Sequence, residues 1–240
     1  MTPEQAAHEA RDAIVSLPSR FMMDPATHAR GTELGFEGFD FYTAGRGGAL
    51  GDVPADVVVS AFVFFPPAAV QAAWERSAPL MPRREAAMEW ARCAHSWARA
   101  HLGTQTDWTR LAELLGRIVW SADVAGAPLF AAWRTLPEPP PLEAKALTVH
   151  RLNALRELRG ALHGAAVLTV GLRPFEAASV RAPKMIPIMG WQDPPEDPVP
   201  LRDRWQLAEA RTDRMLGRHF SVLHDTERTE LVDALGNAAA

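Results

Sequence analysis

Several residue types are scarce in this chain of 240 residues, and each scarcity narrows what the protein can be. Cys93 is the single cysteine, so no disulfide can form within the chain and a disulfide-stapled fold is excluded. Lys145 and Lys184 are the only lysines, and Tyr42 is the only tyrosine. Arginine therefore carries almost all the positive charge, a bias that we attribute to a GC-rich genome rather than to chemistry.

Long hydrophobic runs are also missing. The longest apolar candidate, residues 57–65, falls far short of the roughly 20 residues needed to span a bilayer. The first eleven residues are polar and charged, unlike a secretory signal peptide. These observations predict a soluble cytoplasmic protein without a membrane partner.

The overall charge lacks a basic excess. The net charge is −4, whereas proteins that bind duplex nucleic acid normally carry a positive surplus that neutralises phosphates. A local basic patch can still suffice for DNA, so the balance counts against DNA binding without excluding it. No zinc-type histidine or cysteine spacing and no Gly-x-Ser-x-Gly nucleophile motif is found, and we therefore predict no metal and no cofactor.

The spacing of apolar residues predicts a mainly α-helical protein. Helices are expected at residues 3–17, 25–34, 54–65, 83–102, 107–122, 142–170, 174–181, 201–218 and 226–235. A break is expected near Gly160 or Gly164, and residues 35–51 are expected to form a glycine-rich loop. Valines 57–59 would also suit a strand. Residues 185–191 have the composition of a strand, which Pro187 would restrict to a sheet edge.

A proline-rich segment divides the chain. Residues 137–141 read Pro-Glu-Pro-Pro-Pro, a stiff spacer rather than a flexible tether. We place the boundary there, between a helical N-terminal region at 1–137 and a helix-turn-helix, winged-helix-like region at 138–240. The two regions are expected to pack as one compact unit.

Residues 163–182 fit the pattern of a helix-turn-helix. Gly171 suits the sharp turn, Pro174 suits the first position of the second helix, and small or apolar residues occupy the packing positions. The candidate DNA contacts on this second helix are Arg173, Ser179 and Arg181. The alternative is an ordinary helical hairpin inside a core.

Several longer segments carry a resemblance to a known family. They are residues 41–55, 126–132, 155–163, 211–214 and 230–235. In this order and spacing they resemble the SalK-like helix-turn-helix family of actinobacteria, over roughly residues 20–236. The resemblance implies a multi-helix N-terminal half packed on a MarR-like winged-helix C-terminal half, with at most a small β wing. It also implies a homodimeric regulator.

The chain departs from the pattern of that family at several positions. Leu158 and Ala161 stand where a histidine and an aspartate are expected, and Ala127 stands where an arginine is expected. The segment after Trp191 is short and acidic where a wing should lie. Acidic residues repel phosphate, and this counts against DNA binding by a wing.

A cluster of basic residues suggests a small-molecule pocket. Arg156, Arg159 and His163 are spaced to share one helix face. Facing inward, they would bind a carboxylate or phosphate, and His163 could transfer a proton. Tyr42 and Arg46 are candidate partners in the same site. The alternatives are a solvated basic stripe, or structural pairing with Glu157 or another buried carboxylate.

The last long helix has two distinct sides. One side carries Arg204, Arg211, Arg214 and Arg218, and another carries Trp205, Ala208, Met215 and Leu216. The apolar side either pairs two subunits or packs within the monomer. Together these features predict a ligand-responsive winged-helix-like protein, a transcriptional regulator or a regulator-like sensor. The alternative functions are an enzyme of natural-product metabolism that uses the same pocket for an anionic or aromatic molecule, and a purely structural protein.

Overall fold

The computed structural model describes residues 1–194 and 196–239, and the regular structure within them is entirely helical. The α-helices are α1 Pro3–Ser19, α2 Pro25–Glu33, α3 Asp40–Gly47, α4 Ala55–Ala61, α5 Pro67–Ser77, α6 Arg83–His101, α7 Trp108–Ser121, α8 Pro128–Trp133, α9 Ala144–Thr169, α10 Pro174–Arg181, α11 Arg202–Phe220 and α12 Asp225–Ala239. Short 3-10 helices lie at Arg20–Met23, Gly48–Leu50, Pro183–Met185 and Val199–Leu201.

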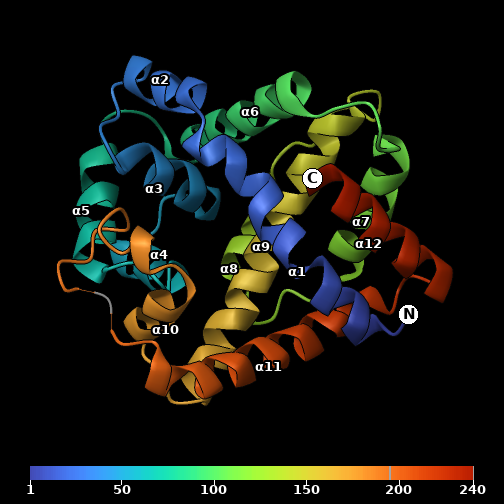
Figure 1. Cartoon of the computed structure of the whole chain (residues 1–240). Helices are drawn as coiled ribbons and strands as arrows, with labels where there is room; N and C mark the ends of the chain where they lie inside the picture. Colours follow the sequence, from blue (N-terminus) through green and yellow to red (C-terminus); the bar gives the residue numbers. More distant parts are fainter. Residues whose placement is uncertain (195, 240) are drawn as a thin grey trace.

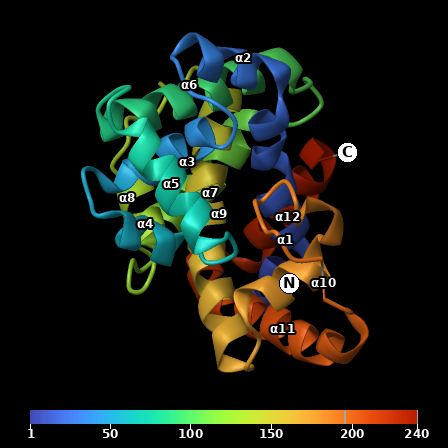
Figure 2. The same ribbon diagram turned by 90° about the vertical axis from the view of Figure 1, so that its left-hand side faces the viewer.

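Helix α9 forms the centre of the molecule. It packs against α1, α6, α7, α8 and α11 (Figure 1). Leu152, Leu155 and Val167 on α9 are fully buried, which is typical of a helix enclosed on most sides. Figure 2 shows α9 running lengthwise to the end of the molecule where α10 and α11 lie. The main hydrophobic core extends from Ala6 to Ala238 and so includes residues from both sides of the spacer at 137–141.

The first helix begins as the sequence predicts and ends later. The Thr2 side chain accepts a hydrogen bond from the Gln5 amide, and the Gln5 side chain accepts one from the Thr2 amide. Together these two bonds form a capping box. The expected end before Pro18 was wrong, because α1 continues through Pro18 to Ser19 and passes directly into a 3-10 turn.

Glycines explain two other differences from the sequence prediction. Residues 35–51 are not only a loop, because they contain α3, whose Gly45 lies directly against α6. A Cβ atom at position 45 would lie 2.6 Å from the Cβ of Trp90, so this glycine permits close helix packing. Helix α9 is not broken at Gly160 or Gly164. Gly164 packs against Val63, where a Cβ atom would be 3.1 Å from the valine side chain.

The predicted edge strand at 185–191 was also wrong. Met185 donates its amide to Ala182, and Met189 donates its amide to Met185, so the segment consists of a 3-10 helix and successive turns. Pro183 and Pro187 favour such turns, since proline fixes its backbone torsion and cannot donate a ladder hydrogen bond. The expected β wing therefore has no strand within residues 1–194 and 196–239.

The two sides of α11 have separate environments. Ala208 and Leu216 are fully buried inside the chain, and Trp205 and Met215 are half-buried. Of the two arrangements that the sequence left open, the apolar side packs within the monomer. The arginine side is exposed except for the half-buried Arg211, and α11 itself runs along the lower edge of Figure 1.

Candidate functional site

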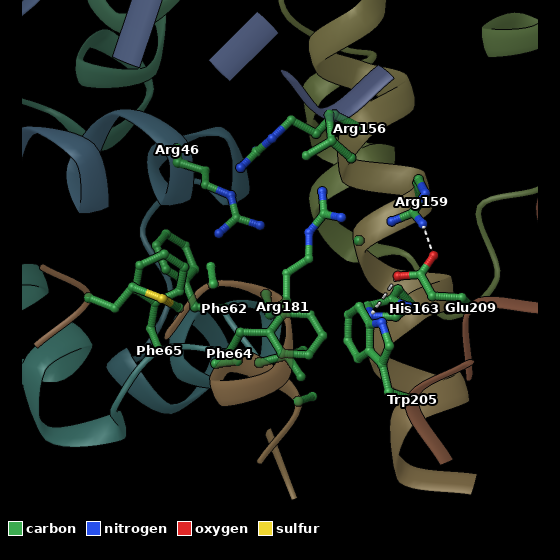
Figure 3. Close-up of a pocket in the computed structure, with 18 residues that line it drawn as sticks. Arg46, Phe62, Phe64, Phe65, Arg156, Arg159, His163, Arg181, Trp205 and Glu209 are labelled. Carbon is green, nitrogen blue, oxygen red and sulfur yellow. Dashed lines mark hydrogen bonds and ion pairs between the residues drawn. The ribbon is translucent and has the colours of Figure 1, made fainter. Parts of the chain in front are cut away.

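A cavity of about 230 Å³ lies where α3, α9, α10 and α11 meet the segment between α4 and α5. Its apolar wall is mainly aromatic, formed by Phe62, Phe64 and Phe65 with Trp205 opposite them (Figure 3). Met189, from the segment after α10, also lines it. The volume is below the roughly 300–1,000 Å³ typical of sites for drug-sized ligands, so the cavity suits a smaller molecule.

The polar wall is made mostly of arginine. Arg46 comes from α3, Arg156 and Arg159 from α9, and Arg181 from α10. His163, one turn along α9 from Arg159, completes this wall. The structure thus brings four of the five predicted ligand-binding residues to one cavity. Arg181, which the sequence assigned to DNA, also lies there, and its side chain reaches toward Arg46 and Arg159 (Figure 3).

Tyr42, the fifth predicted residue, does not line the cavity. Its hydroxyl accepts a hydrogen bond from Arg46 Nη1 at 3.3 Å, and its ring stacks on Phe39 with centroids 5.2 Å apart. Tyr42 therefore helps to position the Arg46 side chain, and it affects the cavity only through this hydrogen bond.

Arg46 and Glu157 form a buried bidentate ion pair. Arg46 Nε and Nη2 each donate to one carboxylate oxygen of Glu157 at 2.8 Å, and Arg156 Nη1 donates to Oε1 at 3.0 Å. Burial alone would raise the pKa of Glu157, but the charge and hydrogen bonds of Arg46 outweigh it, so the pKa lies below its ordinary value. For Arg46, the structural pairing with Glu157 that the sequence left open is what occurs.

Arg159 is held by a carboxylate that the sequence did not reveal. Its Nη2 donates to Glu209 Oε2 at 2.5 Å, across the interface between α9 and α11. Burial, with smaller contributions from the charges of Arg159 and Arg181, lowers the pKa of His163 to about 4, although Glu209 opposes the shift. His163 is consequently neutral at pH 7.

The tautomer of neutral His163 follows from its neighbours. Thr212 Oγ1 lies 2.9 Å from His163 Nδ1 and itself donates to the carbonyl of Ala208 at 2.7 Å. The hydroxyl proton is committed to that carbonyl, so Thr212 accepts and His163 carries its proton on Nδ1. His163 Nε2 is then an unprotonated acceptor, 3.7 Å from Glu209 Oε1.

Three nitrogens of the polar wall lack a protein partner. Arg156 Nε, Arg159 Nε and His163 Nε2 are buried and have no hydrogen bond to any of the described residues. A buried polar group left unsatisfied costs about 1–3 kcal/mol, so this wall holds polar groups that a bound molecule or water would satisfy. Arg181 adds a charge that is only loosely paired, with the exposed Asp12 at 3.9 Å. Four guanidinium groups thus stand against two carboxylates, the buried Glu157 and the half-buried Glu209, and the wall is net positive.

The predicted helix-turn-helix is present as a structural unit. Helix α9 ends at Thr169, Gly171 adopts a φ of +74°, and α10 begins at Pro174. The amide of Leu172 donates back to Val167 at 3.1 Å and closes the turn. A positive φ is easily adopted only by glycine, which is why the sequence signal at this position was reliable.

The three predicted DNA contacts do not form one surface. Ser179 is fully buried, and its hydroxyl donates to Phe175 and accepts from the Glu196 amide. Arg181 is directed into the cavity. Arg173 is the more exposed of the two arginines, and it is bonded to Glu176 and Glu196. In this arrangement Ser179 cannot reach a base.

The segment after α10 covers this helix. The Trp191 ring packs on Phe175 with centroids 4.8 Å apart, and its indole nitrogen donates to the carbonyl of Phe64 at 3.1 Å. The same segment supplies Met189 to the cavity. The helix that would enter a DNA groove is therefore enclosed between the core and an acidic segment.

Comparison with known proteins identifies the family. Residues 7–197 match the sequence model of a helix-turn-helix family, and the chain belongs to that family. No curated protein and no solved structure matches the chain. Membership suggests a DNA-binding regulator in general. Within the described residues no helix is long and apolar enough to cross a membrane, and no group of three His, Cys, Asp or Glu side chains could hold a metal ion.

Proposed function

We propose that this protein is a ligand-responsive helix-turn-helix protein, a transcriptional regulator or a regulator-like sensor, whose cavity binds a small anion with an aromatic body. The observation that carries the proposal is the net positive wall with two unpartnered buried N–H donors, Arg156 Nε and Arg159 Nε. Arginine suits this role because its planar fork matches a carboxylate or phosphate. The aromatic wall opposite supplies the apolar contact that orients the ligand.

The position of the cavity supports a sensing role. Ala177, Ala178 and Arg181 of α10 line it, so a bound ligand would contact the second helix of the helix-turn-helix directly. A ligand that pairs with Arg181 favours one position of that helix over others. Differential contact of this kind is what allows a ligand to shift a conformational equilibrium.

The finer assignments belong to the same proposal. The α9–turn–α10 unit supports the SalK-like resemblance, because that resemblance also implies a helix-turn-helix in the C-terminal half. A MarR-like winged-helix arrangement would have to use the segment 183–201 in place of a β wing. A homodimer would need a surface other than the apolar side of α11, since Ala208 and Leu216 are buried within the chain.

Benzoate and phenylacetate, with the neutral benzamide and phenylacetamide, test the ligand class. We expect the acids to bind and the amides to bind at least tenfold more weakly, by isothermal titration calorimetry. At 100 times its Kd, a bound acid should stabilise the fold by about 2.7 kcal/mol.

Arg181→Gln should weaken binding of the acid about tenfold without unfolding the protein, because the Arg181 side chain is 48% exposed and loosely paired.

The matched control is Arg173→Gln, which removes an exposed arginine near the other end of the same helix. It should leave affinity for the acids unchanged. Equal binding of acids and amides, or equal losses in the two variants, would contradict an anion site. If neither acids nor amides produce heat or a thermal shift, the proposed ligand class is wrong.

Gly160 offers a second test, because it lines the cavity. A Cβ atom at this helical position would meet nothing within 4 Å, so larger side chains project into the empty space. Gly160→Ala should stabilise the fold by roughly 0.5–1 kcal/mol through helix propensity. Gly160→Leu should fill the cavity and abolish binding of benzoate while keeping the melting temperature at or above that of the wild type. Undiminished binding by the leucine variant would place the ligand elsewhere.

His163 supports a second candidate function, an enzyme of natural-product metabolism. A neutral histidine with a fixed Nδ1 proton and a bare Nε2 beside an anion site is a hydrogen-bond acceptor that could remove a proton from a substrate. The two functions differ in the fate of the ligand, because a sensor releases it chemically unchanged and an enzyme converts it. Mass spectrometry of ligands recovered after prolonged incubation separates them, because chemical conversion that is lost in His163→Gln would establish the enzyme.

A further inference from the structure

The outward side of α11 is a basic surface feature that the cavity does not use. From Arg204 to Arg218 its exposed residues are Arg204, Gln206, Leu207, Ala210, Arg214 and Arg218, and Arg211 is half-buried beside them. No carboxylate stands among these positions, and the exposed Asp203 precedes them in the first turn of α11, in a chain whose net charge is −4. We name this set of four arginines, at 204, 211, 214 and 218, the α11 arginine face.

Most other surface arginines are neutralised by acids. Arg110 pairs with Glu113, Glu227 and Glu230, and Arg76 pairs with Asp40 at 2.6 Å. On the α11 arginine face, by contrast, positions 204, 211 and 218 have no carboxylate within ion-pair distance among the described residues. Arg214 has only Glu4, at 3.8 Å, and both side chains are exposed.

Two of these arginines extend the face onto the helix-turn-helix. Arg204 Nη1 donates to the carbonyl of Gly171 at 2.9 Å, and Arg211 Nη1 donates to Thr169 Oγ1 at 2.8 Å. These bonds hold the guanidinium groups beside the turn without neutralising them. Arg173, whose side chain is 66% exposed, stands in the same turn.

The geometry of the face indicates the partner. Positions 204, 211 and 218 recur every seven residues, so they lie along one line of a rigid helix and span about 21 Å, or roughly six base pairs of B-DNA. The opposite side of α11 is buried through Ala208, Leu216 and Phe220, leaving no apolar stripe to insert into a lipid bilayer. A rigid row of unneutralised guanidinium groups instead matches a regular row of phosphates.

We propose that the α11 arginine face, rather than α10, binds the phosphate backbone of double-stranded DNA. The proposal goes beyond the ligand cavity and does not depend on it. The proposal explains how a helix-turn-helix protein whose second helix is enclosed can bind DNA. Contacts with the phosphate backbone of DNA do not require a helix to enter a groove. Binding through phosphates alone carries no direct sequence readout, so affinity should depend strongly on salt and weakly on sequence.

Fluorescence anisotropy with a labelled 25-base-pair duplex tests the face. For about three phosphate contacts, affinity should fall about 40-fold between 50 and 200 mM salt. The triple variant Arg204→Gln, Arg211→Gln and Arg218→Gln should lose at least tenfold in affinity at 50 mM salt. Its salt slope should also shrink by about one for each arginine removed.

A matched triple variant on α6 separates a specific surface from a general charge effect. Arg84→Gln, Arg92→Gln and Arg99→Gln remove the same charge from exposed positions and should leave DNA affinity within about twofold. Equal losses in the two triples would overturn the proposal, as would absence of wild-type binding at 50 mM salt. A larger loss of DNA affinity in Arg173→Gln than in the α11 triple variant would place the DNA contact on α10 instead. Binding to anionic vesicles but not to DNA would assign the face to lipid instead.

Discussion

Replacing Glu157 with glutamine should lower the free energy of unfolding by about 3–5 kcal/mol, the typical cost of removing one partner from a buried ion pair. Glu157 and Arg46 are 4% and 10% exposed, and the glutamine is isosteric, so no cavity contributes to the loss. Arg46 keeps its charge but loses the only carboxylate that holds it in a bidentate bond within the described residues. Urea denaturation followed by circular dichroism measures the change, with an unchanged m-value as the sign that two-state unfolding is preserved.

Two further variants give this prediction its controls. Glu143→Gln breaks the pair with Arg99, in which both side chains are at least 40% exposed, and should cost less than about 1 kcal/mol. Replacing Arg46 with methionine and Glu157 with leucine together should recover part of the loss, because the buried Arg46 charge is removed with its partner and only Arg156, 18% exposed, loses a carboxylate. If Glu157→Gln is as mild as Glu143→Gln, the pair is solvated and the cavity wall is more open than the structure describes.

Local signals in the sequence predicted most of the helices. Thr2, Pro174 and Gly171 mark helix boundaries through their own backbone and capping chemistry, which needs no tertiary contact, and each boundary was confirmed. The errors occurred where tertiary packing decides. Gly45 reads as a loop residue in isolation, and only its contact with Trp90 on α6 explains why a helix needs a glycine there.

The candidate site was predicted only along single helices. The spacing of Arg156, Arg159 and His163 correctly placed them on one side of α9, because helical periodicity is a local property. Glu209 and the aromatic wall come from elements about 40 to 100 residues away, and no local pattern pairs them with α9. Trp205 and Glu209 do lie one turn apart on α11, so the same periodicity could have marked them as neighbours.

Acidification should destabilise the protein well above the pH at which its carboxylates titrate, because of a buried histidine pair. His95 Nε2 and His150 Nδ1 lie 3.1 Å apart, with α6 and α9 packed around them. Burial lowers the pKa of His95 to about 3, assisted by His150, Arg99 and Arg92. Burial also lowers the pKa of His150 to about 4, with Glu138 opposing and Arg151 reinforcing the shift. Both rings are therefore neutral in the folded protein at pH 7, and one donates the shared hydrogen bond.

The direction of the pH dependence follows from the number of protons that the two histidines bind in the folded and unfolded states. Between about pH 4 and pH 6.5 the unfolded chain binds protons at both histidines and the folded chain does not, so stability rises with pH in this window and is complete above it. From pH 7 to pH 5 the histidine pair should lower the free energy of unfolding by about 4 kcal/mol, a large part of the 5–15 kcal/mol typical of a domain.

Urea denaturation at half-unit pH steps measures the slope of the free energy of unfolding against pH. The double variant His95→Gln and His150→Gln should lower it by about 2.7 kcal/mol per pH unit, whereas the exposed His28→Gln should leave it unchanged. A slope that survives in the double variant would assign the acid sensitivity to other groups, His163 first among them, because its burial also lowers its pKa to about 4.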